Sequence, residues 1–570
     1  MNQKVIDILF SILVFSLPFK YIPKLFWQTF LGGPFGQDLV VYPLLIGFVY
    51  TFYCQWKYRN VIYKWDVFKK FIFAYLAVLV ISLAWGLFNY PYYEQILNGP
   101  ADQIEKLPGV LAFLHSAGIS MTEKTLLEFW MFARPIKGVF FEALYTFGAA
   151  YMIFCWYHTR ISRAVDILLR VTTVDLVIIA GYGLIDVCYQ NGQMWAQNVL
   201  MTVNPMLHGG VVLKPVYFGF APRFFWDSQI RSIFLEPSYF GIYMAFAFPL
   251  LWWNIFRENK RWKQAILWLL FTVLAFEIFL TQSRTALAVD LGVFAIFACI
   301  CLYRLQKGLL ILLLALCIGG GIGFAGSMEF MKAGQVPSQI GEWTPLATKW
   351  QNMQKKAAAV KNAADADAKK AQANKGAAGA DAKKAQANKG AAGADATKYI
   401  KSNLMSLSGA EIKGAHAGSN HSRFTVQKTH IIIGLEHPLF GIGTTLRNGY
   451  LREKLDKDPG AEIQKWNKNI DELGLLRGGF ALLGDYSLRF AETGFLGLGL
   501  YLFPSLILLW TFGKVLIKRR GEASFVFVAL AFIGIMATGL GDGINITFCY
   551  WMAMALSFLM LGAVDSDCNF

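Results

Sequence analysis

The chain has 570 residues, of which 56% are hydrophobic and only 16% are charged. This composition leaves too little polar surface to cover a soluble globule of that size, so a bilayer is the expected solvent. The formal net charge of +16 is also typical of nucleic-acid-binding proteins. Here, however, Lys and Arg lie in short clusters between apolar runs, where they determine membrane topology, so we expect no nucleic-acid partner.

The cysteines and the first apolar run limit the class of protein further. All eight cysteines lie inside or beside apolar segments, which predicts no disulfide framework. Cys299 and Cys301 have no second pair at metal-ligand spacing, so we expect neither a metal nor a cofactor. The first apolar run, residues 5–18, lacks a small-residue cleavage site and predicts a retained helix rather than a signal peptide.

Apolar runs long enough to cross a bilayer recur along the chain and predict an all-α polytopic membrane protein with about 12 spanning helices. These runs are residues 5–19, 39–54, 71–87, 138–157, 167–188, 238–256, 262–280, 285–303, 308–326, 494–510, 525–540 and 544–564.

Every second connection between these runs is basic, which places both termini in the cytoplasm. The basic residues are Lys57, Arg59, Lys64, Lys69 and Lys70; Arg160 and Arg163; Arg257, Lys260, Arg261 and Lys263; Arg304 and Lys307; and Lys514, Lys518, Arg519 and Arg520. The pattern makes residues 89–137, 190–237, 281–284 and 327–493 external. In a bacterium with two membranes, that side is the periplasm and the protein lies in the inner membrane.

This topology divides the chain into three parts. Residues 1–326 are expected to form the first nine spans, residues 327–493 a large, mostly helical periplasmic loop, and residues 494–570 the last three spans. The loop contains a low-complexity stretch, residues 356–398, in which DAKKAQANKGAAGA occurs twice. Because this repeat has no large apolar residue to form a core, it is interpreted as a spacer; the alternative is an electrostatic guide for anionic glycan or lipid.

The strongest indication of chemistry is the short external turn that ends in Arg284, between two apolar helices. An arginine at the membrane boundary is a permanent cation whose planar fork suits bidentate capture of phosphate oxygens. The alternative is an interfacial anchor whose guanidinium reaches the lipid headgroups.

Four segments together resemble the O-antigen ligase and polymerase family. Residues 283–289 (SRTALAV) resemble its Ser-Arg motif, and residues 421–443 (HSRF…HIIIGLEHPLFGIG) resemble its loop helix and glycine-rich turn. Residues 483–497 (LGDYSLRFAETGFLG) resemble the segment that enters the next span, and residues 231–241 (RSIFLEPSYFG) the Glu-Pro-Ser element of the polymerase branch. The order, spacing and membrane side of the four segments agree.

The resemblance implies a metal-independent glycosyltransferase that uses undecaprenyl diphosphate-linked sugars on the periplasmic face. By motif, Arg284 and Arg423 match the arginines that hold the diphosphate and stabilise charge on the leaving group. Arg231 is a further candidate for diphosphate binding. For Arg423 the alternative is a solvated salt bridge at the start of a loop helix.

Transfer also requires a base to take the proton of the acceptor hydroxyl. The ligase branch places a histidine nine residues before the Ala-Glu element, where this chain has Leu483 followed by a glycine, so the polymerase branch is favoured. The candidates for the base are Asp485 and Glu236 and, with weaker support, His437 and Glu492. Structural alternatives remain for each of the four, such as a carboxylate at a helix start or a histidine in a turn.

Other polar and small residues inside apolar runs favour structural roles. Glu277 lies seven residues before Arg284 and would orient it if the helix continued. Buried pairing is expected for the remaining acids, and Gly319 and Gly323 predict close helix packing. The acids are Glu142, Asp175, Asp186 and Asp290. The external aromatics between residues 217 and 226 either stack on sugars or form an interfacial belt.

The favoured hypothesis is a polymerase that joins lipid-linked repeat units of an O-antigen or exopolysaccharide, with membrane lipid and a chain-length regulator as partners. One alternative is an O-antigen ligase that transfers the glycan to lipid A core or to protein. The alternative from another class is a flippase or transporter of polyprenyl-linked glycan. Transporters usually have short loops, whereas the motifs here lie in a long external one.

Overall fold

A computed structural model describes residues 2–19, 39–58, 66–100, 103–104, 107–207, 229–234, 236–332, 417–518, 523–543 and 549–566. Within these ranges every regular element is helical, so the predicted all-α class is confirmed. The repeat and the aromatic residues 217–226 lie outside the described residues.

A helix overlaps each predicted apolar run. These helices are α1 (Gln3–Phe15), α4 (Val41–Tyr58), α5 (Asp66–Phe88), α8 (Glu123–Ala143) with α9 (Ala149–Tyr157), α10 (Ile161–Gln190), α13 (Pro237–Arg257), α14 (Arg261–Thr281), α15 (Arg284–Arg304), α16 (Lys307–Lys332), α23 (Asp485–Lys518), α24 (Ala523–Thr538) and α25 (Cys549–Ser566). The shorter elements are α6 (Tyr93–Leu97), α7 (Leu107–Ser116), the π-helical turn η2 (Leu144–Gly148), α11 (Met194–Leu207), α20 (Ala417–Glu436), α21 (Arg447–Leu455) and α22 (Ala461–Leu473).

The outward faces of the long helices show that this is a membrane protein. Among the described residues, seven helices are long and apolar enough to cross a bilayer. On α16, Ile311, Leu314, Ile318 and Ile322 are all at least half exposed, and their spacing places them on one helix face. Such a contiguous apolar stripe is unfavourable in water and is expected against lipid.

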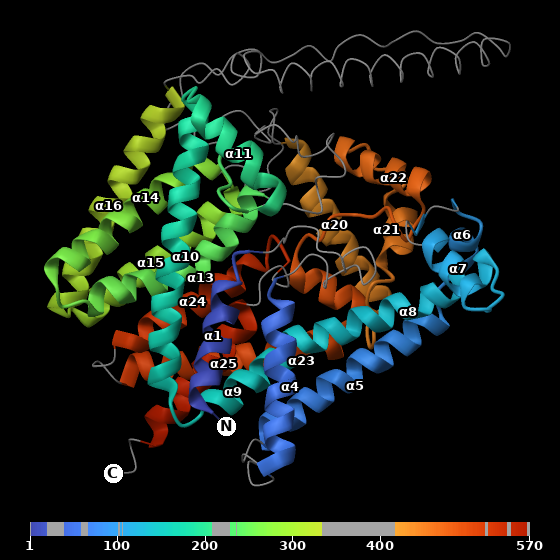
Figure 1. Ribbon diagram of the computed structural model, residues 1–570, viewed down its shortest axis with the longest axis horizontal. Helices are drawn as coiled ribbons and strands as arrows, with labels where there is room; N and C mark the ends of the chain where they lie inside the picture. Colours follow the sequence, from blue (N-terminus) through green and yellow to red (C-terminus); the bar gives the residue numbers. More distant parts are fainter. Residues whose placement is uncertain are drawn as a thin grey trace.

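Helix α13 is the centre of the bundle, and it packs against α14, α15 and α24 (Figure 1). Small residues allow these helices to approach closely. A Cβ atom on Gly241 of α13 would overlap the Ala286 Cβ of α15, and one on Gly534 of α24 would lie 2.3 Å from the Ala245 carbonyl oxygen. Gly323 meets the backbone of α14 in the same way, which confirms the close packing predicted for Gly319 and Gly323.

Two segments that the sequence places outside the membrane share a second hydrophobic core. Tyr90 and Tyr92 follow α5, and they pack with Val426, Leu451 and Ile463 of α20, α21 and α22. Figure 1 shows α6 and α7 grouped with α20, α21 and α22 at one side of the molecule. The Tyr92 hydroxyl donates a hydrogen bond to Glu453, which joins the two segments further.

Helix α23 is broken at Gly494, whose backbone has φ 65° and ψ −167°. The Tyr501 hydroxyl donates to Asp485 Oδ2 over 2.7 Å, although the two residues are 16 positions apart. A straight helix would separate them by about 24 Å, so the chain folds back at Gly494. The break lies at the residue where the sequence predicts that this span begins.

The fourth span differs from its predicted bounds of 138–157. Helix α8 begins at Glu123, inside the predicted external segment, and continues through the π-helical turn into α9. The charged residue Arg134 interrupts the apolar pattern, but its guanidinium donates to the Leu476 carbonyl oxygen inside the protein. A charge satisfied in this way does not end a helix, and hydropathy alone cannot reveal it.

Candidate functional site

The turn that carries Arg284 is held by its own backbone. Helix α14 ends at Thr281, and Gln282 takes a left-handed conformation with φ 51°. The Ser283 amide donates to Thr281 Oγ1 over 3.1 Å, and the Ser283 carbonyl oxygen accepts the first helical hydrogen bond of α15, from Leu287. The reversal therefore places Arg284 at the first position of α15, between two apolar helices as the sequence predicts.

Arg423 of α20 lies in the electrostatic neighbourhood of Arg284, so two motifs far apart in the sequence meet. Arg423 Nη1 donates to Asp542 Oδ1 over 2.8 Å and to the Gly541 carbonyl oxygen over 3.2 Å. A Cβ on Gly541 would lie 2.9 Å from Cγ2 of Thr285, the residue after Arg284. The start of α15, the start of α20 and the loop after α24 thus converge.

The two guanidinium groups repel each other, and acidic side chains partly offset the repulsion. Asp542 is only 7% exposed and neutralises Arg423, while Glu462 of α22 attracts Arg284. Arg423 keeps 29% of its side chain exposed, so an incoming ligand can reach it. Two adjacent forked cations at a membrane boundary suit an anion with several phosphate oxygens.

Glu236 lies at the start of α13, next to the start of α15. Its backbone carbonyl accepts hydrogen bonds from Tyr239 and Phe240, and its side chain accepts one from Ser238 Oγ over 3.3 Å. The contact of Gly241 with Ala286 sets α13 and α15 side by side. Their positive helix ends therefore add to the field of the arginines.

Arg231 connects Glu236 to the buried acid Asp186. The Arg231 and Ser232 amides donate to Asp186 Oδ2 over 3.3 and 2.9 Å. Burial lowers the pKa of Arg231, which is 7% exposed, while the charges of Asp186 and Glu236 act in the opposite direction. We call Arg231, Glu236, Arg284, Arg423 and Asp542 the arginine site.

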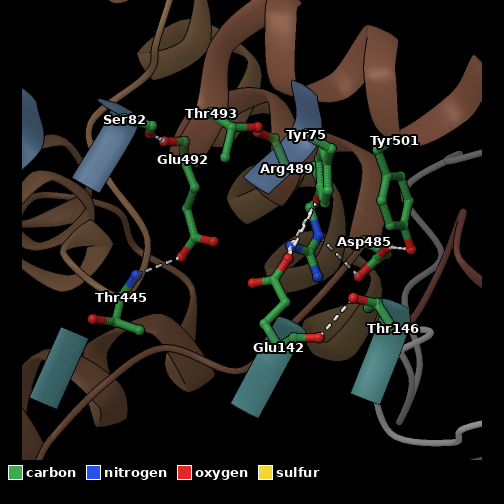
Figure 2. A network of polar contacts seen from close by, with 10 residues as sticks. All are labelled: Tyr75, Ser82, Glu142, Thr146, Thr445, Asp485, Arg489, Glu492, Thr493 and Tyr501. Carbon is green, nitrogen blue, oxygen red and sulfur yellow. Dashed lines mark hydrogen bonds and ion pairs between the residues drawn. The ribbon is translucent and has the colours of Figure 1, made fainter. Parts of the chain in front are cut away.

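Asp485 points into a buried polar network instead (Figure 2). Its side chain is 1% exposed, accepts the Tyr501 hydrogen bond and lies 3.9 Å from Arg489 Nε. Arg489 is ion-paired with Glu142 of α8, and its guanidinium lies 5.0 Å from the centre of the Tyr501 ring. The pairing predicted for Glu142 is thereby confirmed. The Asp485 amide donates to the Gly539 carbonyl oxygen, so only its backbone contacts the loop that carries Asp542.

Glu492 and His437 hold the glycine-rich turn after α20. The Thr445 amide donates to Glu492 Oε1 over 3.0 Å, and Ser82 of α5 donates to the Glu492 carbonyl oxygen (Figure 2). The His437 ring packs edge-on against Tyr450, with 5.6 Å between the ring centres. Both side chains are engaged in packing the turn against α5, α21 and α23.

Glu277 does not reach Arg284 along a continuous helix, because α14 ends at Thr281. Its side chain is fully buried and faces Gly183 of α10, where a Cβ would lie 2.5 Å from the carboxylate. The prediction that Glu277 orients Arg284 required a continuous helix between them, and the helix does not continue. Glu277 instead lies in the field of Asp186.

Two residues of these sites were not singled out from the sequence. Asp542 stands in the small-residue run Gly-Leu-Gly-Asp-Gly between the last two apolar runs, where a turn is the obvious interpretation. Arg489 stands five residues before the predicted start of a span, a common place for an interfacial cation. In both cases the sequence shows only a charged residue beside an apolar run. The residue that pairs with it lies more than 100 positions away in the sequence.

Among the described residues, no group of three or more His, Cys, Asp or Glu side chains could hold a metal ion. No protein-family model matches the sequence, and no curated protein is significantly similar to it. The resemblance to the O-antigen ligase and polymerase family therefore rests on the short motifs and remains a proposal.

The buried pair of Glu142 and Arg489 predicts a specific loss of stability. Glu142→Ala leaves the Arg489 guanidinium, 2% exposed, without its ion pair and is expected to cost about 3–5 kcal/mol. Thermal unfolding in detergent micelles measures the change. Adding Arg489→Met should recover part of the loss, because an apolar pair carries no uncompensated charge.

Lys468→Ala is the matched control, because Lys468 pairs with Glu472 on the surface of α22 with 75% of its side chain exposed. A surface pair contributes little. Equal unfolding midpoints for Glu142→Ala and Lys468→Ala would contradict the importance of the buried network.

Proposed function

We propose that this chain polymerises undecaprenyl diphosphate-linked oligosaccharide repeat units into O-antigen or exopolysaccharide on the periplasmic face of the inner membrane. One observation carries the proposal: Arg423, predicted to hold the diphosphate together with Arg284, binds the carbonyl oxygen of Gly541, and Gly541 packs against Thr285, the residue after Arg284. Arg231 and the carboxylate of Glu236 interact electrostatically at the start of α13, the helix that packs on α15 through Gly241 and Ala286. Phosphate recognition and a base are the two requirements of metal-independent glycosyl transfer.

The proposal includes the topology of about 12 spans with both termini in the cytoplasm. Ion pairs support its sidedness. Arg163 at the start of α10 binds Asp7 near the start of α1, and Arg257 at the end of α13 binds Asp166. These helix ends are all predicted to be cytoplasmic. The arginine site lies at the other ends of α10, α13 and α15, on the proposed periplasmic side.

In the proposed reaction, the growing chain is the donor and an incoming repeat unit is the acceptor. The acceptor hydroxyl oxygen attacks C1 of the donor sugar, and the bond from C1 to the diphosphate oxygen breaks. The electron pair leaves with undecaprenyl diphosphate, whose charge Arg284 and Arg423 stabilise. The hydroxyl proton passes to a carboxylate.

We assign that carboxylate to Glu236 rather than to Asp485. Glu236 is half-buried at the start of α13, beside the start of α15. Asp485 is 1% exposed and its oxygens face Tyr501 and Arg489. A base must reach the reacting hydroxyl, directly or through one water, and of these two carboxylates Glu236 is the more exposed.

Reconstitution tests the function directly. Purified protein in micelles is incubated with lipid-linked repeat units and with an acceptor such as lipid A core, and the products are separated by size. Longer lipid-linked chains support the polymerase. Transfer to the new acceptor would instead identify a ligase, and a lack of any product together with movement of the lipid-linked glycan in vesicles would identify a transporter.

Arg284→Ala is expected to lower the polymerisation rate by at least about 10²-fold, because it removes charge stabilisation of the leaving diphosphate. Arg284→Lys should recover little of the rate, because an ammonium group cannot grip two oxygens with a planar fork. Product length and rate in the reconstituted assay measure both variants.

Arg257→Ala is the matched control for this prediction. Arg257 is an equally apolar-flanked arginine at the far end of α13, where it pairs with Asp166 and keeps 46% of its side chain exposed. If the Arg284→Ala variant makes polysaccharide of normal chain length, Arg284 does not take part in the reaction.

Glu236→Gln keeps the shape of the side chain but removes the base, and it should lower the maximal rate by about 10²–10⁴-fold. Donor KM should not rise, because the substitution removes a negative charge beside the arginines. Asp485→Asn provides the comparison. If Asp485→Asn abolishes turnover at an unchanged unfolding midpoint while Glu236→Gln stays active, the base is Asp485.

A further inference from the structure

Helix α20 carries an apolar stripe that no other described residue covers. Phe424, Ile431, Ile432, Leu435 and Leu439 are 50%, 46%, 38%, 59% and 62% exposed. Their spacing places those within α20 on one face, and Leu439 follows in the turn after the helix. The opposite face is protein-facing: Val426, His430 and Ile433 are fully buried.

A single exposed apolar side chain is ordinary on a protein surface, but a stripe of five along one element is not. One charged residue, the exposed Lys428, lies on this face in the middle of the helix, between Phe424 and Ile431. From Ile431 to Leu435 the face is apolar. A helix with this pattern is unsuited to an aqueous loop, which is where the sequence places residues 327–493.

The stripe is continuous with the lipid-facing surface of α23. The Phe495 amide donates to the Pro438 carbonyl oxygen over 2.7 Å, and a Cβ on Gly434 would lie 2.5 Å from the Phe490 ring. Phe495 and Leu496, 56% and 44% exposed, begin the spanning part of α23 after the break at Gly494. The end of α20 therefore lies against the break in α23, beside exposed apolar residues of that helix.

We infer that α20 is a membrane-embedded helix whose stripe contacts the acyl chains of the outer leaflet. The helix starts beside Arg423 at the polar boundary and descends along α23 to the turn that packs on Gly494. Its backbone is hydrogen-bonded within the helix, as hydrocarbon requires, and Thr429 on the inner face donates to the Thr425 carbonyl oxygen. This inference needs only the membrane class of the chain and is independent of the proposed function.

The inference gives the position of Arg423 a physical basis. Because the stripe begins at the next residue, Phe424, anchoring α20 in hydrocarbon holds the Arg423 guanidinium at the level of lipid phosphates. The side chain does not have to reach across an aqueous loop to meet a membrane-bound diphosphate.

A nitroxide spin label at position 435 tests the contact with lipid. In a background in which the native cysteines are replaced by serine, Leu435→Cys is labelled, and the protein is reconstituted into phosphatidylglycerol and phosphatidylethanolamine vesicles. Collision rates are measured with O₂, which concentrates in hydrocarbon, and with a water-soluble nickel chelate. Leu439→Cys is the second variant and carries the test if Leu435→Cys fails to fold.

Matched labels define the extremes. Leu506→Cys on α23 and Lys468→Cys on α22 report lipid and water, and Ile433→Cys reports the protein interior. An O₂ rate above the nickel rate, as at position 506, supports the inference. A nickel rate above the O₂ rate would return α20 to the aqueous loop. Low rates with both reagents, as at position 433, would mean that protein covers the stripe, and this would also overturn the inference.

Discussion

The fold depends on one constraint, which is that hydrocarbon offers no partner for a charge or a backbone polar group. Several charged groups within the bundle are satisfied by other parts of the chain, although the buried carboxylates of Glu277 and Asp290 have no hydrogen-bond partner among the described residues. Arg489 is paired with Glu142 and stacked near Tyr501, and Arg134 donates to a backbone carbonyl oxygen. Asp186 accepts two backbone amides. These pairings connect α5, α8 and α23 and fix the loop before α13, so polar groups determine how apolar helices are arranged.

The same constraint separates two kinds of arginine. Arg489 is 2% exposed and already paired by Glu142, so it has no capacity for a ligand and acts as a structural cation. Arg423 shares its charge with Asp542 but remains 29% exposed, and Arg284 lies beside it at the start of a span. A like-charged pair at a boundary is costly without a counterion. Asp542 and Glu462 supply part of that opposing charge, and the exposed part of Arg423 leaves this site better suited to binding an anion than the buried Arg489 is.

The sequence predicts this fold well where one-dimensional patterns suffice. Hydropathy identifies the helices, and the turn before Arg284 follows from two apolar runs separated by four residues. Prediction from the sequence fails where the position of a side chain depends on a residue far away in the chain. Arg423 and Asp542 lie 119 residues apart, and no local pattern connects them. The orientation of Asp485 depends on a single backbone conformation at Gly494, and the acceptor of Arg134 is a carbonyl oxygen in a distant loop.

The break at Gly494 unites these observations. A Cβ at this position would lie 2.5 Å from the backbone of Leu439, so a glycine is required both for the positive φ and for the approach of the turn after α20. That contact fixes the lower end of α20, while Asp542 and the Gly541 carbonyl oxygen fix Arg423 near its upper end. Held at both ends, α20 has little freedom to move Arg423 away from Arg284. Arg423 is thus positioned by α23, through Gly494, and by the loop after α24, rather than by the predicted external loop in which it is found.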